Sequence, residues 1–252
     1  MLNLIRTVTL GVWLTTTVVP VALSIVLASA FVRGKALFAF ARLWCQLALW
    51  GAERIAGVHA RVHGWDHVAS AHAANQRLVI CAKHQSAWET FFFLATMPRP
   101  LAYVFKKELL HVPFFGWAMG RLDMIHIDRK QRSRAFAKVV QQGRRLMQEG
   151  VWVIMFPEGT RIPRGQKGEY KSGGARLAIA AGVPVIPIAV TSARCWPTRA
   201  FVKRPGVVDI SIGKAIPSQG RTAEELMLEV ETWIESEMHR LDPEAYAGSS
   251  AH

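Results

Sequence analysis

The sequence is poor in cysteine and in acidic residues. Only three cysteines occur in 252 residues (Cys45, Cys81 and Cys195), and none forms a Cys-x-x-Cys pair. An odd number of scattered cysteines argues against a disulfide framework and a thiolate metal site, and is typical of a reducing compartment. Asp and Glu number 18 against 31 Lys and Arg, a formal net charge of +13. Such an excess favours anionic partners: nucleic acid, an anionic membrane surface or phosphorylated substrates.

Charge is also absent from the 26 residues between Arg6 and Arg33, a run long enough to cross a hydrocarbon core. Pro20 lies inside this run and predicts a kink or break unless neighbours compensate. A second apolar stretch, Ala36 to Ala52, has Arg42 in its middle, so we do not expect it to span a bilayer alone. Together with a 51% hydrophobic content and nine tryptophans, these runs indicate a membrane surface rather than nucleic acid as the anionic partner.

We therefore expect residues 1–57 to form a helical hairpin embedded in, or bent across, one membrane. A buried pair of core helices is the alternative. More basic residues follow the first apolar run than precede it: Arg33, Lys35, Arg42 and Arg54 against Arg6. The positive-inside bias then places everything downstream in the cytoplasm, whether the hairpin spans the membrane or only enters it.

The rest of the chain alternates β-type and helical segments, which predicts an α/β fold with a mostly parallel central sheet flanked by helices. We expect one α/β domain over residues 58–241 and a disordered tail over 242–252. About seven strands are predicted, at 58–63, 77–82, 101–105, 123–127, 151–156, 185–190 and 207–212. The clearest helices are 131–149, 172–181 and 222–241, the last with a capping box in Thr222 and Glu225.

Val79 to Thr90, VICAKHQSAWET, joins a strand to a helix start. Ser86 and Glu89 have the spacing of a capping box, which leaves His84 in the loop before the helix. Within one helix two residues five apart point about 140° from each other, so His84 and Glu89 meet only if His84 precedes it. A histidine at a strand end near a carboxylate suggests a general base and its orienting acid. Alternatively, Glu89 only caps the helix and His84 is an ordinary loop residue.

A second candidate site follows the apolar strand at 151–156, where the sequence is Phe-Pro-Glu-Gly-Thr-Arg. Gly159 allows close backbone approach and the Arg161 guanidinium grips two oxygens, as a phosphate seat requires. Lys171 opens a helix whose first amides could face an anion, and Lys106 follows another strand. An ordinary solvated basic loop is the alternative.

Three other patterns contain candidate functional residues. His59, His63 and His67 are spaced by four, but the segment alternates as a strand does, so we expect no metal site. Cys81 lies inside an apolar strand, where a nucleophilic thiolate is disfavoured. Val185 and Ile186, beside Pro184 and Pro187 in a strand that we expect at an edge or bulge, either line a hydrocarbon site or fill the core.

Taken together, these motifs resemble one family, the glycerolipid acyltransferases, and above all the bacterial 1-acyl-sn-glycerol-3-phosphate acyltransferases. The four family blocks occur in order at 84–89, 105–109, 156–161 and 183–187. The third is complete, while the first has Glu89 where the family usually has aspartate.

The resemblance implies acyl transfer from acyl-CoA or acyl carrier protein to lysophosphatidic acid, giving phosphatidic acid at a bacterial inner membrane. His84 would be the base and Glu89 its orienting acid, and no cofactor or metal would be required. The expected phosphate-binding residues are Lys106, Glu158, Gly159, Thr160, Arg161 and Lys171. The expected acyl-binding residues are Trp88, Phe92, Val185 and Ile186. Another lysolipid as acceptor, such as a lyso-ornithine lipid or a lysophospholipid, and a non-catalytic lipid-binding protein remain alternatives.

Overall fold

The computed structural model of the chain describes residues 1–128 and 132–247, and these contain a seven-stranded sheet. The strands are β1 (Val58–His63), β2 (Val79–Ala82), β3 (Leu101–Lys106), β4 (Ile125–Ile127), β5 (Trp152–Met155), β6 (Val185–Val190) and β7 (Gly206–Ile212). Their order in the sheet is β1-β7-β6-β2-β5-β3-β4. Every neighbouring pair is parallel except β6 and β7, so the predicted fold class is confirmed.

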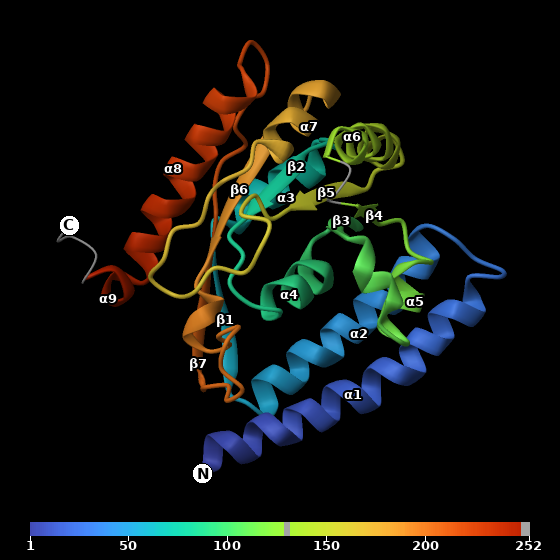
Figure 1. Cartoon of the computed structure of the whole chain (residues 1–252), viewed down its shortest axis with the longest axis vertical. Coiled ribbons are helices and arrows are strands. Elements are labelled where there is room, and N and C mark those ends of the chain that lie inside the picture. Colours follow the sequence, from blue (N-terminus) through green and yellow to red (C-terminus); the bar gives the residue numbers. More distant parts are fainter. Residues whose placement is uncertain (129–131, 248–252) are drawn as a thin grey trace.

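Helices cover both faces of this sheet (Figure 1). On one face lie α6 (Arg132–Gln148), α7 (Gly173–Ala181) and α8 (Ala223–Leu241), against the alternate side chains Val79, Cys81, Val153 and Val185. The opposite face carries α3 (Trp65–Ala73) and α4 (Trp88–Thr96), which pack on Ile80, Ile154 and Ile186. Strands buried on both faces are continuously apolar, as their sequences are. Gln131, the predicted first residue of α6, lies outside the described residues.

The amino-terminal hairpin consists of α1 (Leu2–Ala28) and α2 (Lys35–Arg54), which lie side by side beneath α4 (Figure 1). Of the kink or break expected at Pro20 in the absence of compensation, the break does not occur, because α1 continues through Pro20. Within the described residues, α1 is the one helix with the length and apolar composition to cross a membrane. The Trp13 indole donates to the carbonyl of Leu47, and Gly51 leaves the room that this indole occupies. The hairpin therefore packs closely enough for α1 and α2 to act as one unit.

Arg42, the charge that interrupts the second apolar stretch, binds the end of a helix instead of solvent. Its guanidinium donates to the carbonyl oxygens of Ala95 and Met97, at the carboxyl end of α4. A cation at this end is favoured by the unpaired carbonyls and the helix dipole. The hairpin is thereby tied to the α/β part, and Leu37, Ala41 and Cys45 share one core with the sheet.

Two sequence predictions are corrected. Residues 242–246 are not a disordered tail, because Pro243–Tyr246 form helix α9 and both Asp242 and Tyr246 are buried. Asp242 accepts two hydrogen bonds from Arg164, which holds this segment in place. Residues 248–252 lie outside the described chain. In addition, of the two alternatives for the proline-flanked strand, an edge or a bulge, the edge is wrong because β6 is a central strand, while the interruption of its pairing with β7 at Pro187 fits the bulge.

Candidate active site

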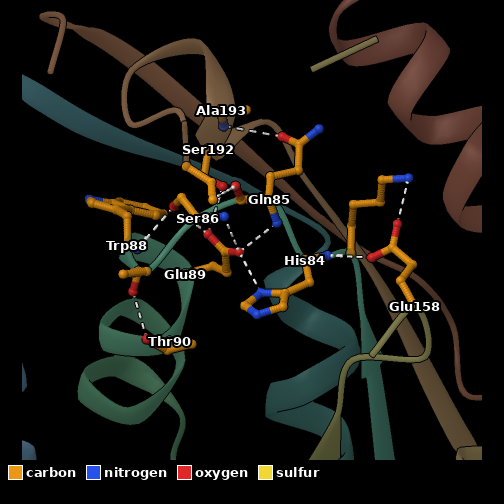
Figure 2. A network of polar contacts seen from close by, with 12 residues as sticks. His84, Gln85, Ser86, Trp88, Glu89, Thr90, Glu158, Ser192 and Ala193 are labelled. Atoms are coloured by element: carbon orange, nitrogen blue, oxygen red, sulfur yellow. Dashed lines mark hydrogen bonds and ion pairs between the residues drawn. The ribbon is translucent and has the colours of Figure 1, made fainter. Parts of the chain in front are cut away.

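His84 and Glu89 form a hydrogen-bonded pair just beyond the carboxyl end of β2. The distance from His84 Nδ1 to Glu89 Oε1 is 2.9 Å, and Figure 2 shows the imidazole turned toward this carboxylate. Because an ionised carboxylate only accepts hydrogen bonds, Nδ1 carries the proton and Nε2 keeps its lone pair free. The imidazole also stacks on the ring of Phe156 from the end of β5, with centroids 3.9 Å apart. Both contacts fix the orientation of the ring.

Glu89 is fully buried and receives five hydrogen bonds. Besides His84, the donors are the amides of Gln85 and Ser86 and the hydroxyls of Ser86 and Ser192, all within 2.6–2.7 Å. Burial raises the pKa of Glu89, but the hydrogen bond and charge of His84, then Ser192 and Ser86, outweigh it and lower the pKa below its usual 4.5. Glu89 is therefore a stable anion beside the imidazole.

The predicted capping box forms only in part. Glu89 binds the Ser86 amide as a capping box requires, but the Ser86 hydroxyl accepts from the amide of Trp88 and donates to Glu89. As a consequence α4 begins at Trp88, with Ala87 as its N-cap. Glu89 thus holds the helix start and the imidazole at once, so the two interpretations of this residue both apply.

A cavity of about 710 Å³ opens at His84 and extends between the α/β part and the hairpin. Gly159, Thr160 and Arg161 line its polar end together with Lys106. Its apolar walls come mainly from α1, α2, α4 and α5 (Phe115–Met119), through Val18, Val21, Ala22, Ile25, Ala41, Trp44, Phe91, Leu94, Phe115, Ala118 and Met119. A hollow of about 750 Å³ beside α6 shares no lining residue with this cavity and has no described acid or nucleophile in its lining.

Three cations face the polar end of the cavity: Lys106, Arg161 and Arg199. Within the described residues none of them has an ion-pair partner, which leaves their charge available to an anion. Lys203 lies near Arg161, and burial and then the charge of this neighbour lower the pKa of the Lys203 ammonium group. Gly159 adopts a positive φ of 66°, so a glycine is needed at this bend of the loop.

Adjacent parallel strands explain why these groups meet. His84 follows β2, the Phe156–Arg161 loop follows β5, Lys106 ends β3 and Ser192 follows β6. These four strands are neighbours and run in the same direction, so their carboxyl ends lie along one edge of the sheet. The edge gathers a base, its acid and a set of cations.

Not every predicted site residue reaches the cavity. Trp88, Phe92, Val185 and Ile186 are buried in the packed core and are absent from the cavity lining, so the structure corrects the four expected acyl contacts. The apolar lining comes instead from other side chains of α4 and from the hairpin, and no local sequence pattern indicates that the hairpin packs against the α/β part. Lys171 is exposed and away from the lining, and only its backbone amide is engaged, with the carbonyl of Pro157.

Glu158 is buried behind His84 rather than in the cavity. One carboxylate oxygen accepts the amide of His84 at 2.8 Å (Figure 2). The other lies 2.8 Å from Nζ of the fully buried Lys83. Burial raises the pKa of Glu158, and the opposing effect of Lys83 only partly cancels this rise. Glu158 is therefore placed to hold the backbone of His84 and not to touch a ligand in the cavity.

Sequence reasoning missed four residues of this site: Lys83, Gln85, Ser192 and Arg199. Gln85 links two loops, because its side chain accepts the amide of Ala193 and its carbonyl accepts the hydroxyl of Thr198. Ser192 carried a usable signal, since polar residues at the carboxyl ends of parallel strands gather at ligand sites. Arg199 carried none, because it lies on an irregular loop after the sheet is almost complete.

Comparison with known proteins gives consistent relatives. Residues 59–191 match the family model described as Acyltransferase. The chain is 40% identical to the 1-acyl-sn-glycerol-3-phosphate acyltransferase of Pseudomonas aeruginosa, over 86% of this chain and 88% of that relative. It is 30% identical to human 1-acyl-sn-glycerol-3-phosphate acyltransferase beta, over 61% of this chain and 56% of that relative.

A solved structure has the same fold. It is the crystal structure of the 1-acyl-sn-glycerophosphate (LPA) acyltransferase PlsC from Thermotoga maritima, with a TM-score of 0.78 and 22% sequence identity. The similarity covers 95% of this chain and 96% of that one. It therefore includes the amino-terminal hairpin as well as the sheet.

Proposed function

This chain belongs to the acyltransferase family, and from that premise we propose that it transfers an acyl group from a thioester to the free hydroxyl of 1-acyl-glycerol-3-phosphate, giving phosphatidic acid. The His84–Glu89 pair, whose histidine lines an apolar cavity, carries this proposal because it unites a base with a site for a lipid. Family membership makes the chain an enzyme, which sets aside a non-catalytic lipid-binding protein.

The proposed chemistry follows from the orientation of His84. The free Nε2 of His84 accepts the proton of the acceptor hydroxyl while the hydroxyl oxygen attacks the thioester carbonyl carbon. A carbon–oxygen bond forms, the carbon–sulfur bond breaks, and the imidazolium returns its proton to the departing thiolate. Glu89 stabilises the imidazolium through Nδ1. General-base help of this kind is typically worth about 10²–10⁴-fold in rate, or roughly 3–5 kcal/mol. Acyl-CoA or acyl carrier protein is the proposed donor, with no cofactor or metal.

We further propose that the acceptor phosphate binds Lys106 and Arg161, as the sequence predicts, and also Arg199. A phosphate monoester carries up to two negative charges, and three unpaired cations at the polar end of the cavity complement it. A choline- or ornithine-bearing lysolipid offers less negative charge to the same cations. The amides beside Gly159 and the hydroxyl of Thr160 complete the polar end, while Lys171 has no proposed contact with the phosphate.

The α1–α2 hairpin is proposed as the membrane-associated part, residues 1–57 as in the sequence prediction, with residues 58–241 as the catalytic part on the cytoplasmic side of a bacterial inner membrane. The length and apolar composition of α1 support this proposal, as does the larger number of basic residues after α1 than before it.

The acceptor is tested by following thiol release from acyl-CoA with lysophosphatidate, a lysophosphatidylcholine and a lyso-ornithine lipid. We expect turnover with lysophosphatidate and little with the others; a preference for either of the others would overturn the proposed acceptor. His84→Ala should lower kcat by at least ~10²-fold with little change in acceptor affinity, whereas His59→Ala, at an exposed histidine, should not. Near-normal turnover by His84→Ala would remove the base assignment.

The phosphate contacts need a separate comparison. Arg161→Ala and Arg199→Ala should each raise KM for lysophosphatidate several-fold and leave kcat nearly unchanged, because each removes one charged contact. Arg204→Ala, at an exposed arginine of the same loop outside the cavity lining, is the matched control. An equal effect of Arg199→Ala on an uncharged monoacylglycerol acceptor would contradict the phosphate role.

A further inference from the structure

A buried cluster of charges lies directly behind His84. The side chain of Lys83 has no exposed surface, and its Nζ lies 2.8 Å from Glu158 Oε1 and 2.6 Å from Glu235 Oε1. Tyr170 donates its hydroxyl to the same Glu235 oxygen at 2.7 Å. Removing a lysine from water costs several kcal/mol, so a lysine at such a position is kept only where its partners compensate.

The cluster joins three parts of the chain that are distant in sequence. Lys83 extends β2, and its amide donates to the carbonyl of Ile188 in β6. Glu158 belongs to the loop after β5, and Glu235 lies on α8, which covers the far face of the sheet from the cavity. The Lys83 ammonium group therefore links the end of β2, next to His84, to the loop after β5 that contains Arg161.

The connection to the reacting group is made through the backbone. The carboxylate that binds Lys83 accepts the His84 amide with its second oxygen, and the carbonyl of His84 accepts the amide of Ile162, at 2.8 Å each. The Glu158–Ile162 loop thus forms hydrogen bonds with both the amide and the carbonyl group of His84. Any shift of Glu158 moves His84 and the Arg161 side of the cavity relative to each other.

Resting on the proposed function, we propose that Lys83 is a positioning residue for acyl transfer: it anchors Glu158, and so keeps the imidazole of His84 and the cations of the Arg161 loop at the separation that the acceptor requires. Lys83 itself touches no substrate. A misplacement of about 1 Å at a reacting group costs on the order of 10²-fold in rate, so an anchor of this kind matters.

The central variant is Lys83→Met, which keeps the volume and removes the ammonium group. We expect kcat to fall about 10- to 100-fold and KM for lysophosphatidate to rise several-fold, because His84 and Arg161 would no longer be held at the required separation. KM for acyl-CoA should change little. The control is Arg164→Met, which breaks the ion pair between the partly exposed Arg164 and the buried Asp242 and does not touch Glu158 or His84. It should lower the melting temperature without changing kcat.

The pH profile provides a readout that lost stability alone does not move. Glu158 faces Lys83, Glu235 on α8, Tyr170 and the amide of His84. Without Lys83, the Glu158 carboxylate takes up a proton at higher pH, and its hydrogen bond to the His84 amide weakens. The acid limb of kcat/KM should therefore move to higher pH in Lys83→Met and stay in place in Arg164→Met.

A double variant keeps the test decisive if Lys83→Met is too unstable to assay. Lys83→Met with Glu235→Gln removes one charge of each sign, so we expect melting temperature to recover and kinetics to remain impaired. If melting temperature and kinetics both recovered in the double variant, Lys83 would serve only to balance buried charge, and the proposal would be overturned. Normal kinetics in Lys83→Met would overturn it as well. Failure of the wild-type chain to acylate lysophosphatidate is a different result: it overturns the proposed function, and this inference with it.

Discussion

At the scale of single residues, the site depends on the hydrogen bonds that hold the Glu89 carboxylate beside His84. His84 and Glu89 were predictable because a strand end, a capping pattern and a five-residue spacing are local signals, and their pairing is confirmed. Lys83 was not predictable, because its partner Glu235 lies 152 positions away and a lysine after a strand resembles any solvated strand end. Its burial depends on α8 closing over the sheet, which no local pattern encodes.

Glu89→Gln tests the residue scale. An amide has one acceptor oxygen and would turn its NH₂ group toward donors, so the variant should lose activity and on the order of 2–3 kcal/mol of stability. Thermal unfolding and thiol release measure both effects. Glu149→Gln, at an exposed ion pair with Arg145, is the control and should behave as the wild type. An active Glu89→Gln enzyme with an unchanged melting temperature would contradict the assigned hydrogen bonds.

The same variant has a pH signature. Because folding lowers the pKa of Glu89 below 4.5, its ionised form stabilises the fold fully above about pH 4.5, and this contribution is lost as the pH falls through the lowered pKa. The stability gap between wild type and Glu89→Gln should be constant from neutral pH to about pH 4.5 and narrow below it.

At the scale of elements, the hairpin is a wall of the cavity as well as the proposed membrane segment. The sequence predicted its two helices, but the cavity lining at Val21, Ala22 and Ile25 depends on the packing of α1 against α2 and against α5, which follows α1 by more than 80 residues of sequence. The predicted acyl contacts at Trp88 and Phe92 failed for this reason: an apolar residue near a catalytic motif is as easily core as lining.

Ala22→Phe tests this wall. Ala22 is buried on the cavity side of α1, so a phenyl group there should fill the cavity and lower kcat/KM for long acyl chains about 10-fold relative to short ones. Leu23→Phe is the matched control, since its neighbouring position is 41% exposed and outside the lining. Acyl donors of increasing length measure the preference. An equal loss for all lengths would instead indicate disruption of the hairpin.

At the scale of the whole molecule, the exposed apolar side chains are distributed unevenly. The exposed large apolar side chains gather mainly on α1, α2 and the segment around α5, at Leu4, Ile5, Val8, Val12, Leu23, Leu27, Phe40, Leu43, Trp50, Leu109, Val112 and Trp117. A concentration of exposed apolar side chains on a few helices is typical of a membrane-contacting surface. The net charge of +13 favours anionic partners, which suits the proposed contact with anionic lipid headgroups.

Vesicle binding tests the molecular scale. Val8→Glu with Val12→Glu should weaken co-sedimentation with anionic vesicles several-fold, because two exposed apolar contacts become charges of the same sign as the lipid. Leu228→Glu is the control: Leu228 is 63% exposed, but on α8 at the opposite side of the sheet. Raising the salt concentration should weaken the electrostatic part for all variants. Equal loss in the control would mean that binding has no preferred face.

The hydrogen bond from the backbone of Lys203 to the hydroxyl of Thr7 joins the first turns of the chain to the loop that carries Arg199. The start of α1 therefore helps to hold the loop that carries a proposed phosphate contact. A purification tag fused before α1, or removal of part of α1 to gain solubility, should shift that loop, so substrate preferences measured on such a preparation should differ from those of the unmodified chain.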